Sequence, residues 1–398
     1  MINERQEKDM NQQSKRKKPL GIYVHIPFCV KKCAYCDFLS MPAGEEVKKQ
    51  YANAVLEEIE DYRQYTKEYQ VQTIYFGGGT PSFMPAEYIR NILHKLQDVF
   101  EIDDLKSLEV TLEVNPGTVD EKKWKAYREM GINRISMGLQ STDNKTLKKI
   151  GRIHTYETFL ENYRMARSCG FHNISVDIMS ALPEQTIEQY KQTLETVATL
   201  SPEHISSYSL IIEEGTPFWE WYKEGGELEQ ELPDEEEERK MYELTKEILQ
   251  KYGYERYEIS NYAKKGFESK HNSSYWTGTS YLGIGLGASS YFEGERYQNV
   301  DELETYFLCA GNREQRIQNR EKIGTIASMQ EFMFLGLRRM CGVSKKEFKQ
   351  RFGQSMEDVY GETLMDLLEK DLLCIEGDKV YLTDHGIDVS NYVFSAFL

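Results

Sequence analysis

Three closely spaced cysteines near the start of the chain are the residues with the clearest capacity for chemistry. Cys29, Cys33 and Cys36 stand in the spacing C-x3-C-x2-C within the stretch GIYVHIPFCVKKCAYCDFLS, residues 21–40. Three thiolates on one loop can hold three irons of a cubane cluster, whereas full protein ligation uses four cysteines. The spacing therefore predicts a [4Fe–4S] cluster with one iron open to a small molecule.

A zinc knuckle and chance clustering are the alternatives for these cysteines. Zinc sites usually supply four ligands, often as two separated pairs, and no second pair follows in this sequence. The other cysteines stand singly, which is not a disulfide framework: Cys169, Cys309, Cys341 and Cys374. Because a low-potential iron–sulfur site needs reducing surroundings, we expect a cytoplasmic protein.

Length and charge narrow the class of protein. The chain has 398 residues and a formal net charge of -16, which favours two or three domains and no steering towards nucleic acid. Residues 1–18 are polar without the apolar core of a signal peptide, so we expect a disordered tail. No run reaches the roughly 18–20 apolar residues of a membrane span, so we expect no integral membrane segment.

Short β-rich runs alternate with helical patterns over the first half of the chain. The expected strands are 21–28, 71–76, 107–114, 134–140, 173–179 and 204–212. Apolar residues at helical spacing predict helices at 45–67, 86–100, 119–130, 156–169 and 187–200. This order indicates an α/β fold with parallel strands. Six strands fit a partial (β/α)6 barrel better than a closed eight-stranded one.

Unusual polar residues follow the carboxyl ends of these strands, where α/β barrels carry their chemistry. The second strand runs into GGGTP at 77–81, and the next three carry Glu113, Gln140 and Asp177. Asp177 alone fits a satisfied core carboxylate equally well, and the glycine run alone fits a tight turn. The run is neither a Walker loop nor a dinucleotide fingerprint, although glycines let the backbone approach a ligand closely.

Together these motifs resemble the radical S-adenosylmethionine (SAM) proteins, whose signature is the three-cysteine pattern. Within them, the chain resembles the oxygen-independent coproporphyrinogen III oxidase family, and most closely its haem-chaperone branch. The stretches that carry the resemblance cover nearly all of the chain after the tail: YVHIPFCVKKCAYCDF, YFGGGTPS, LEVNPGT, RISMGLQS, IGRIHT, VDIM, HNSSYWTGTSYLGIGLGASSY and EFMFLGLRRM.

The resemblance implies a [4Fe–4S] cluster on the three cysteines and SAM at the open iron. It also implies the residues that line the SAM site: Tyr23, Tyr35, Gly78, Gly79, Thr80, Glu113, Gln140, Arg152 and Asp177. The charges agree with this assignment. Acids suit the sulfonium, amine and ribose diol of SAM, and Arg152 suits its carboxylate.

One position separates the two branches of the family. The oxidase pattern has a further cysteine two residues after the third cluster cysteine, where this chain has Phe38 after Asp37. The Asp-Phe pair is the chaperone-type variant and argues against coproporphyrinogen decarboxylation. Three functions stay open: a haem chaperone that delivers haem to acceptor proteins, the oxidase, and another radical SAM enzyme such as a methylase. An electron donor is a further partner if SAM is cleaved.

The segment HNSSYW contains a candidate haem ligand. His271 stands beside Tyr275 and Trp276, ahead of a Gly-rich loop at 278–287. Imidazole is a common axial haem ligand, and aromatic rings can cover a porphyrin face. The segment also resembles the haem-binding signature of the chaperone branch. We therefore expect haem at His271, with a structural turn as the alternative.

The chain is expected to divide into four parts. These are the tail 1–18, the barrel 19–250, an extension with HNSSYW at 251–323, and a C-terminal domain at 324–398. Helices at 331–340, 345–351 and 363–372 with a hairpin at 373–382 make the last part winged-helix-like. Its candidate recognition helix, TLMDLLEKDL, is acidic, so we interpret the domain as a cover for the barrel and not as a DNA reader.

Overall fold

Six parallel strands form the centre of the computed structural model, which describes residues 17–398. They are β1 (Lys18–Ile26), β2 (Tyr69–Gly78), β3 (Glu109–Val114), β4 (Arg134–Gln140), β5 (Ile174–Ser180) and β6 (His204–Ser209). Each pairs in parallel with the next in chain order. The expected α/β fold with a partial barrel is confirmed. The expected tail lies outside the described residues except for its last two, and Lys18 already belongs to β1.

Later strands extend this sheet at both edges to twelve strands. They are β7 (Glu255–Glu258), β8 (Asn261–Ala263), β9 (Ser280–Ile284), β10 (Ser289–Phe292), β11 (Glu295–Asn299) and β12 (Ile317–Lys322). Strand β9 was not expected, and it pairs in parallel with the free side of β1. The final order is β12-β11-β10-β9-β1-β2-β3-β4-β5-β6-β8-β7.

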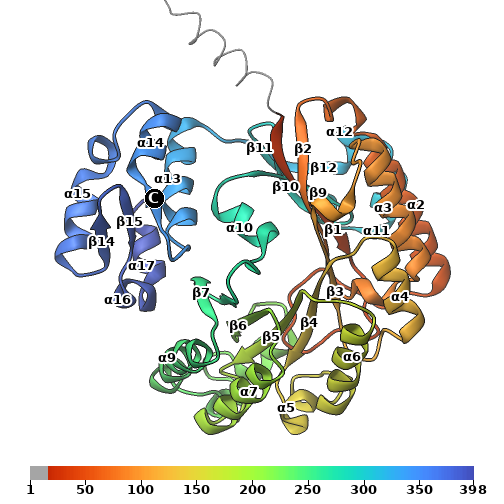
Figure 1. The fold of residues 1–398 in the computed structure, drawn as a ribbon, viewed down its shortest axis with the longest axis horizontal. Helices are drawn as coiled ribbons and strands as arrows, with labels where there is room; N and C mark the ends of the chain where they lie inside the picture. Colours follow the sequence, from red (N-terminus) through yellow and green to blue (C-terminus); the bar gives the residue numbers. More distant parts are fainter. Residues whose placement is uncertain (1–16) are drawn as a thin grey trace, which may run out of the picture.

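Helices cover the outer side of the curved sheet (Figure 1). The five expected in the first half of the chain are α2 (Glu45–Glu60), α3 (Ala86–Val99), α4 (Glu121–Glu129), α6 (Tyr156–Ser168) and α7 (Ile187–Thr199). The others before the C-terminal part are α5 (Asn144–Lys149), α8 (Pro217–Tyr222), α9 (Glu235–Lys251), α10 (Lys270–Trp276), α11 (Leu303–Cys309) and α12 (Arg313–Arg316). Helix α10 lies on the inner side of the sheet. Between residues 17 and 398, the helices lack the length and apolarity that crossing a bilayer would require.

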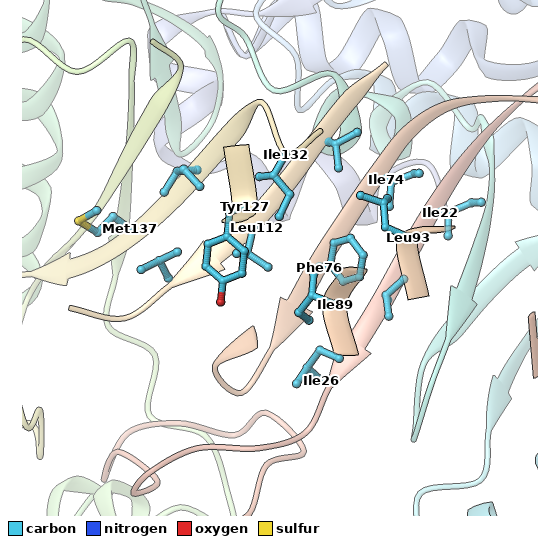
Figure 2. Close-up of a cluster of buried hydrophobic side chains, with 14 of the residues drawn as sticks. Ile22, Ile26, Ile74, Phe76, Ile89, Leu93, Leu112, Tyr127, Ile132 and Met137 are labelled. Atoms are coloured by element: carbon cyan, nitrogen blue, oxygen red, sulfur yellow. The ribbon is translucent and has the colours of Figure 1, made fainter. Parts of the chain in front are cut away.

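The two faces of the sheet differ in character because successive strand residues point to opposite sides. Ile22, Ile74 and Phe76 point outwards and pack against Ile89 and Leu93 of α3 (Figure 2). Each such fully buried side chain stabilises the fold by about 1.5–3 kcal/mol. The alternate residues point inwards and are largely polar or aromatic, so the sheet presents its chemistry to the inside of the barrel.

The extension after α9 is bound to the start of the chain through Glu58 of α2. This carboxylate is fully buried and accepts hydrogen bonds from Gly285 N at 2.9 Å, Asn299 Nδ2 at 2.7 Å and Tyr306 Oη at 2.5 Å. The guanidinium of Arg316 lies 3.3 Å from it. A buried charge needs such partners, so the extension completes the barrel.

The C-terminal part is mainly helical, as expected, and has its own hydrophobic core. It contains α13 (Thr325–Gly336), α14 (Lys345–Phe352), α15 (Met356–Glu369), α16 (Asp384–Asp388) and α17 (Ser390–Ser395). A small sheet pairs β13 (Val343–Ser344) with β15 (Lys379–Leu382) and β15 with β14 (Leu373–Glu376). This part touches the barrel through α10, where the guanidinium of Arg338 lies 4.4 Å from the ring centroid of Trp276.

Candidate functional site

A cavity of about 490 Å³ opens at the carboxyl ends of the parallel strands. Most of the residues expected to bind the cluster and SAM line it: Cys29, Cys33, Tyr35, Cys36, Gly78, Gly79, Thr80, Glu113, Gln140, Arg152 and Asp177. They come from β2, β3, β4 and β5 and from the loops that follow β1, β2 and α5. Tyr23 and His271 do not line this cavity.

The cysteine loop lies between β1 and α2. A backbone hydrogen bond of 3.3 Å from Cys36 N to Cys33 O makes a tight turn, and all three thiols are free. Within residues 17–398, no three ligating side chains converge as they would around a single metal ion, whereas a cubane offers each cysteine its own iron. Burial raises the pKa of Cys36 to about 11, so cluster binding must displace the thiol proton.

The glycine loop after β2 is pinned against the cysteine loop. Gly79 N donates to Ile26 O at 2.8 Å, and Thr80 N donates to Phe28 O at 2.8 Å. A Cβ at Gly79 would lie 2.9 Å from the Cys29 sulfur, and one at Gly78, where φ is +114°, would lie 2.6 Å from His25. The close contact between the two loops therefore leaves no room for side chains at Gly78 and Gly79. The three cysteine thiols and the exposed backbone of this glycine loop fit an iron–sulfur cluster with a small ligand.

Arg152 bridges the cysteine loop and β4. Its Nη2 donates to Asn115 Oδ1 and to Gly138 O, both at 2.6 Å, and its Nη1 lies 3.7 Å from the Cys33 sulfur. Asn115 in turn donates to Thr80 Oγ1 at 2.7 Å. Sequence reasoning did not assign Asn115 to the site, although its place directly after β3 was the available signal.

Two carboxylates face the cavity without an ion-pair partner among the described residues. Glu113 accepts hydrogen bonds from Tyr75 Oη at 2.8 Å and Gly78 N at 3.3 Å, and Asp177 accepts one from Ser136 Oγ at 2.9 Å. Neither forms an ion pair within 4.0 Å with any residue from 17 to 398. Burial raises the pKa of both, that of Glu113 to about 7. Such acids suit a cationic ligand.

Glu113 should make SAM binding pH-dependent. Below its pKa of about 7 the carboxyl is neutral, and above it the carboxylate attracts the ligand cation. SAM affinity is therefore expected to rise by up to about tenfold per pH unit as the pH approaches this pKa, and then to level off. Calorimetry about one unit below and above the pKa would measure the change. Glu113→Gln should lose this part of the pH dependence and keep only that of Asp177 and of SAM itself, and a wild-type profile identical to this variant's would contradict the assignment.

His271 lies buried beside the barrel wall, 1% exposed. Its Nδ1 is 2.7 Å from Thr73 Oγ1 and its Nε2 is 2.9 Å from Tyr275 Oη. Burial lowers its pKa to about 3, so the imidazole is neutral with both nitrogens engaged. Tyr23 lies nearby on β1, with its hydroxyl 3.1 Å from His25 Nδ1. Asn272 is the member of HNSSYW that reaches the cavity.

The cavity also contains residues that the sequence analysis did not assign to the cluster or to SAM. Phe38 and Ile211 line it while 60% and 67% exposed, and Tyr208 accompanies them. Arg134 lines it from the amino end of β4 and is 1% exposed. The signal for Arg134 was a charged residue at an inward position of a strand whose alternate residues are apolar.

Comparison with known families agrees with this arrangement. The family model described as the radical SAM superfamily matches residues 23–197, and the HemN C-terminal domain matches residues 326–389. The chain has the fold of the coproporphyrinogen III oxidase HemN from Escherichia coli, with a TM-score of 0.82 and 21% identity, over 100% of this chain and 93% of that one.

Full-length relatives give the narrower assignment. The chain is 38% identical to the heme chaperone HemW of Lactococcus lactis, over 96% of this chain and 98% of the relative. It is 37% identical to HemW of Bacillus subtilis, over 94% and 98%, and 30% identical to HemW of Escherichia coli, over 96% and 98%. With the three-cysteine loop and the barrel cavity in place, the chain belongs to the HemW family of radical SAM proteins.

Proposed function

We propose that this protein is a haem chaperone that binds a [4Fe–4S] cluster, SAM and haem and delivers haem to acceptor proteins. The observation that carries the proposal is identity of 30–38% over nearly the whole chain to proteins named heme chaperones. The free thiols suit a reducing compartment, so we propose the cytoplasm. We also propose that residues 324–398 act as a cover for the barrel, since their Arg338 packs on α10.

In this proposal different cavity residues bind the cluster and the different parts of SAM. The three cysteines hold the cluster, which when bound supplies an open iron and one-electron reduction for SAM. Glu113 and Asp177 attract the cationic groups and the diol of SAM, while the backbone of Gly78–Thr80 receives its amino-acid part. Arg152 keeps the cysteine loop in register with β4 through Asn115 and Gly138, and its Nε has no partner among the described residues.

Haem is proposed to bind at the HNSSYW segment with His271 as ligand. Because both imidazole nitrogens are hydrogen-bonded in this structure, ligation would exchange the bond to Thr73 or Tyr275 for one to iron. A bond to Tyr275 is the easier one to exchange, since both residues belong to α10 and a rotation of the tyrosine side chain frees Nε2.

Replacing His271 by alanine is expected to remove the imidazole ligand and to change the optical spectrum and affinity of bound haem. Tyr275→Phe is the matched control, because it frees Nε2 while leaving the imidazole in place. The optical spectrum of haem bound to Tyr275→Phe should therefore resemble that of the wild type. An unaltered spectrum and affinity in His271→Ala would exclude His271 as the ligand.

Parallel assays of haem transfer and porphyrinogen turnover test the proposed function itself. After anaerobic reconstitution, the protein should bind haem and pass it to an apo-haemoprotein. The oxidase is the second candidate, favoured by the HemN-like fold over the whole chain, whereas Phe38 in place of a cysteine argues against it. SAM-dependent conversion of coproporphyrinogen III to protoporphyrinogen IX would reject the chaperone in favour of the oxidase.

A further inference from the structure

We infer that Arg134 is a carboxylate-binding residue on the floor of the barrel cavity, in addition to Arg152 near the cysteine loop. It stands at the amino end of β4, on the same inward face as Ser136 and Gly138. Its chain neighbour Ile135 and the next outward residue Met137 are fully buried against the outer helices. The alternation of β4 therefore fixes the guanidinium on the inside of the barrel.

The side chain of Arg134 has no hydrogen-bonded or ion-paired partner among the described residues. It is 1% exposed, yet it makes no hydrogen bond within 3.5 Å and no ion pair within 4.0 Å with any residue from 17 to 398. Its Nε is buried without a hydrogen-bond partner, as is that of Arg316, so the absence of any ion pair is what distinguishes Arg134. Its charge acts on the buried Glu113 and Asp177, where it opposes the rise in pKa that burial causes. Neither carboxylate lies within ion-pair distance of the guanidinium, so its N–H donors are available to a ligand.

Arg316 is a buried arginine with a structural role, and its ion pairs can be compared with the surroundings of Arg134. It is also fully buried, but it lies 3.3 Å from Glu58 and 2.8 Å from Asp61. The contrast separates a paired arginine in the wall of the molecule from an unpaired one that lines the cavity.

The groups around Arg134 do not satisfy it. The charge of Arg134 acts on Glu113 and Asp177, but each carboxylate is hydrogen-bonded to a hydroxyl group and not to Arg134. The imidazoles of His204 and His271 are buried, and the charge of Arg134 adds to burial in lowering the pKa of both. Both are therefore neutral, and Arg134 is the cation that the cavity floor offers to an anion.

The ligand group that fits is an organic carboxylate, since the planar guanidinium fork binds carboxylates in a bidentate manner. Two molecules of the proposed function carry one, and the inference rests on that function: SAM through its methionine part, and haem through its propionates. The exposed rim of Phe38, Tyr208 and Ile211 would receive an apolar body whose carboxylate reaches inwards.

Ligand pairs that differ only in the carboxylate test the inference on the reconstituted full chain. SAM is compared with decarboxylated SAM, and haem with haem dimethyl ester, against wild type, Arg134→Gln and Arg134→Lys. We expect Arg134→Gln to lose about ten- to hundredfold in affinity for one of the two carboxylates and nothing for its carboxylate-free partner. Arg134→Lys should recover part of the loss. A selective loss for SAM assigns the methionine carboxylate, and one for haem assigns a propionate.

Thermal unfolding without ligand supplies an independent readout. Removal of an unpaired buried charge should leave the melting temperature of Arg134→Gln unchanged or higher. Equal affinities of wild type and both variants for all four ligands, or a loss that is the same with and without the carboxylate, would overturn the inference. If wild type binds no haem, the proposed function fails on its own, and the SAM pair alone decides the role of Arg134.

Discussion

Replacing Cys29, Cys33 and Cys36 together by alanine is expected to abolish the iron–sulfur cluster. The three thiols lie on one loop, and a fourth cysteine that could substitute for them does not line the cavity. Thiolates are the ligating form, so the variant retains no cluster ligand there. Iron content after anaerobic reconstitution should fall to background, and the paramagnetic signal of the reduced cluster should disappear.

Cys374→Ala is the matched control for this variant. That thiol is free and partly exposed on β14 of the C-terminal part, so it shares the chemistry of the loop cysteines but not their position. It should keep full iron content. Iron content and a paramagnetic signal in the triple variant that equal those of wild type would show that the cluster is bound elsewhere.

Asp177→Ala is expected to weaken SAM binding roughly ten- to hundredfold while leaving the cluster intact. A charge-assisted contact is typically worth about 1.5–3 kcal/mol, and Asp177 faces the cavity with its charge unpaired. Because burial already raises the pKa of this carboxyl, its removal should not destabilise the fold. Calorimetric titration of the reconstituted protein with SAM measures the loss.

Ser136→Ala separates the charge of Asp177 from its positioning. The Ser136 hydroxyl donates to Asp177 at 2.9 Å and the Ser175 hydroxyl at 3.2 Å, so this variant removes one of the donors that position the carboxylate and keeps its charge. We expect it to lose far less affinity than Asp177→Ala. Wild-type affinity in Asp177→Ala would remove Asp177 from the SAM site.

Local sequence patterns were sufficient to predict the first six strands and their helices. Alternation of outward residues such as Ile74 and Phe76 with inward Tyr75 marks a strand covered by helices on one face. The pairing of β9 with β1 could not be predicted in this way, because it joins segments more than two hundred residues apart. The pattern of β9 itself, in a Gly-rich stretch, carries little periodic signal.

Site residues that lie at the end of a strand could be predicted from the sequence. Residues whose environment depends on partners far away in the sequence could not. Glu113 and Asp177 were recognisable from their strands, and the structure brings both to one cavity. The burial of His271 was not visible in HNSSYW, since its hydrogen-bond partner Thr73 comes from β2. Arg134 was missed because nothing local shows that a charged residue lacks a partner.

The position of β9 beside β1 has a consequence for synthesis on the ribosome. Strand β1 emerges first, but one of its edges stays unpaired until Ser280–Ile284 has been made, and an open strand edge invites association with other chains. The buried charge of Glu58 likewise stays without its cationic partner until Arg316 has been made. Since the cysteine loop continues directly from β1, we expect the cluster to be inserted only after most of the polypeptide has left the exit tunnel.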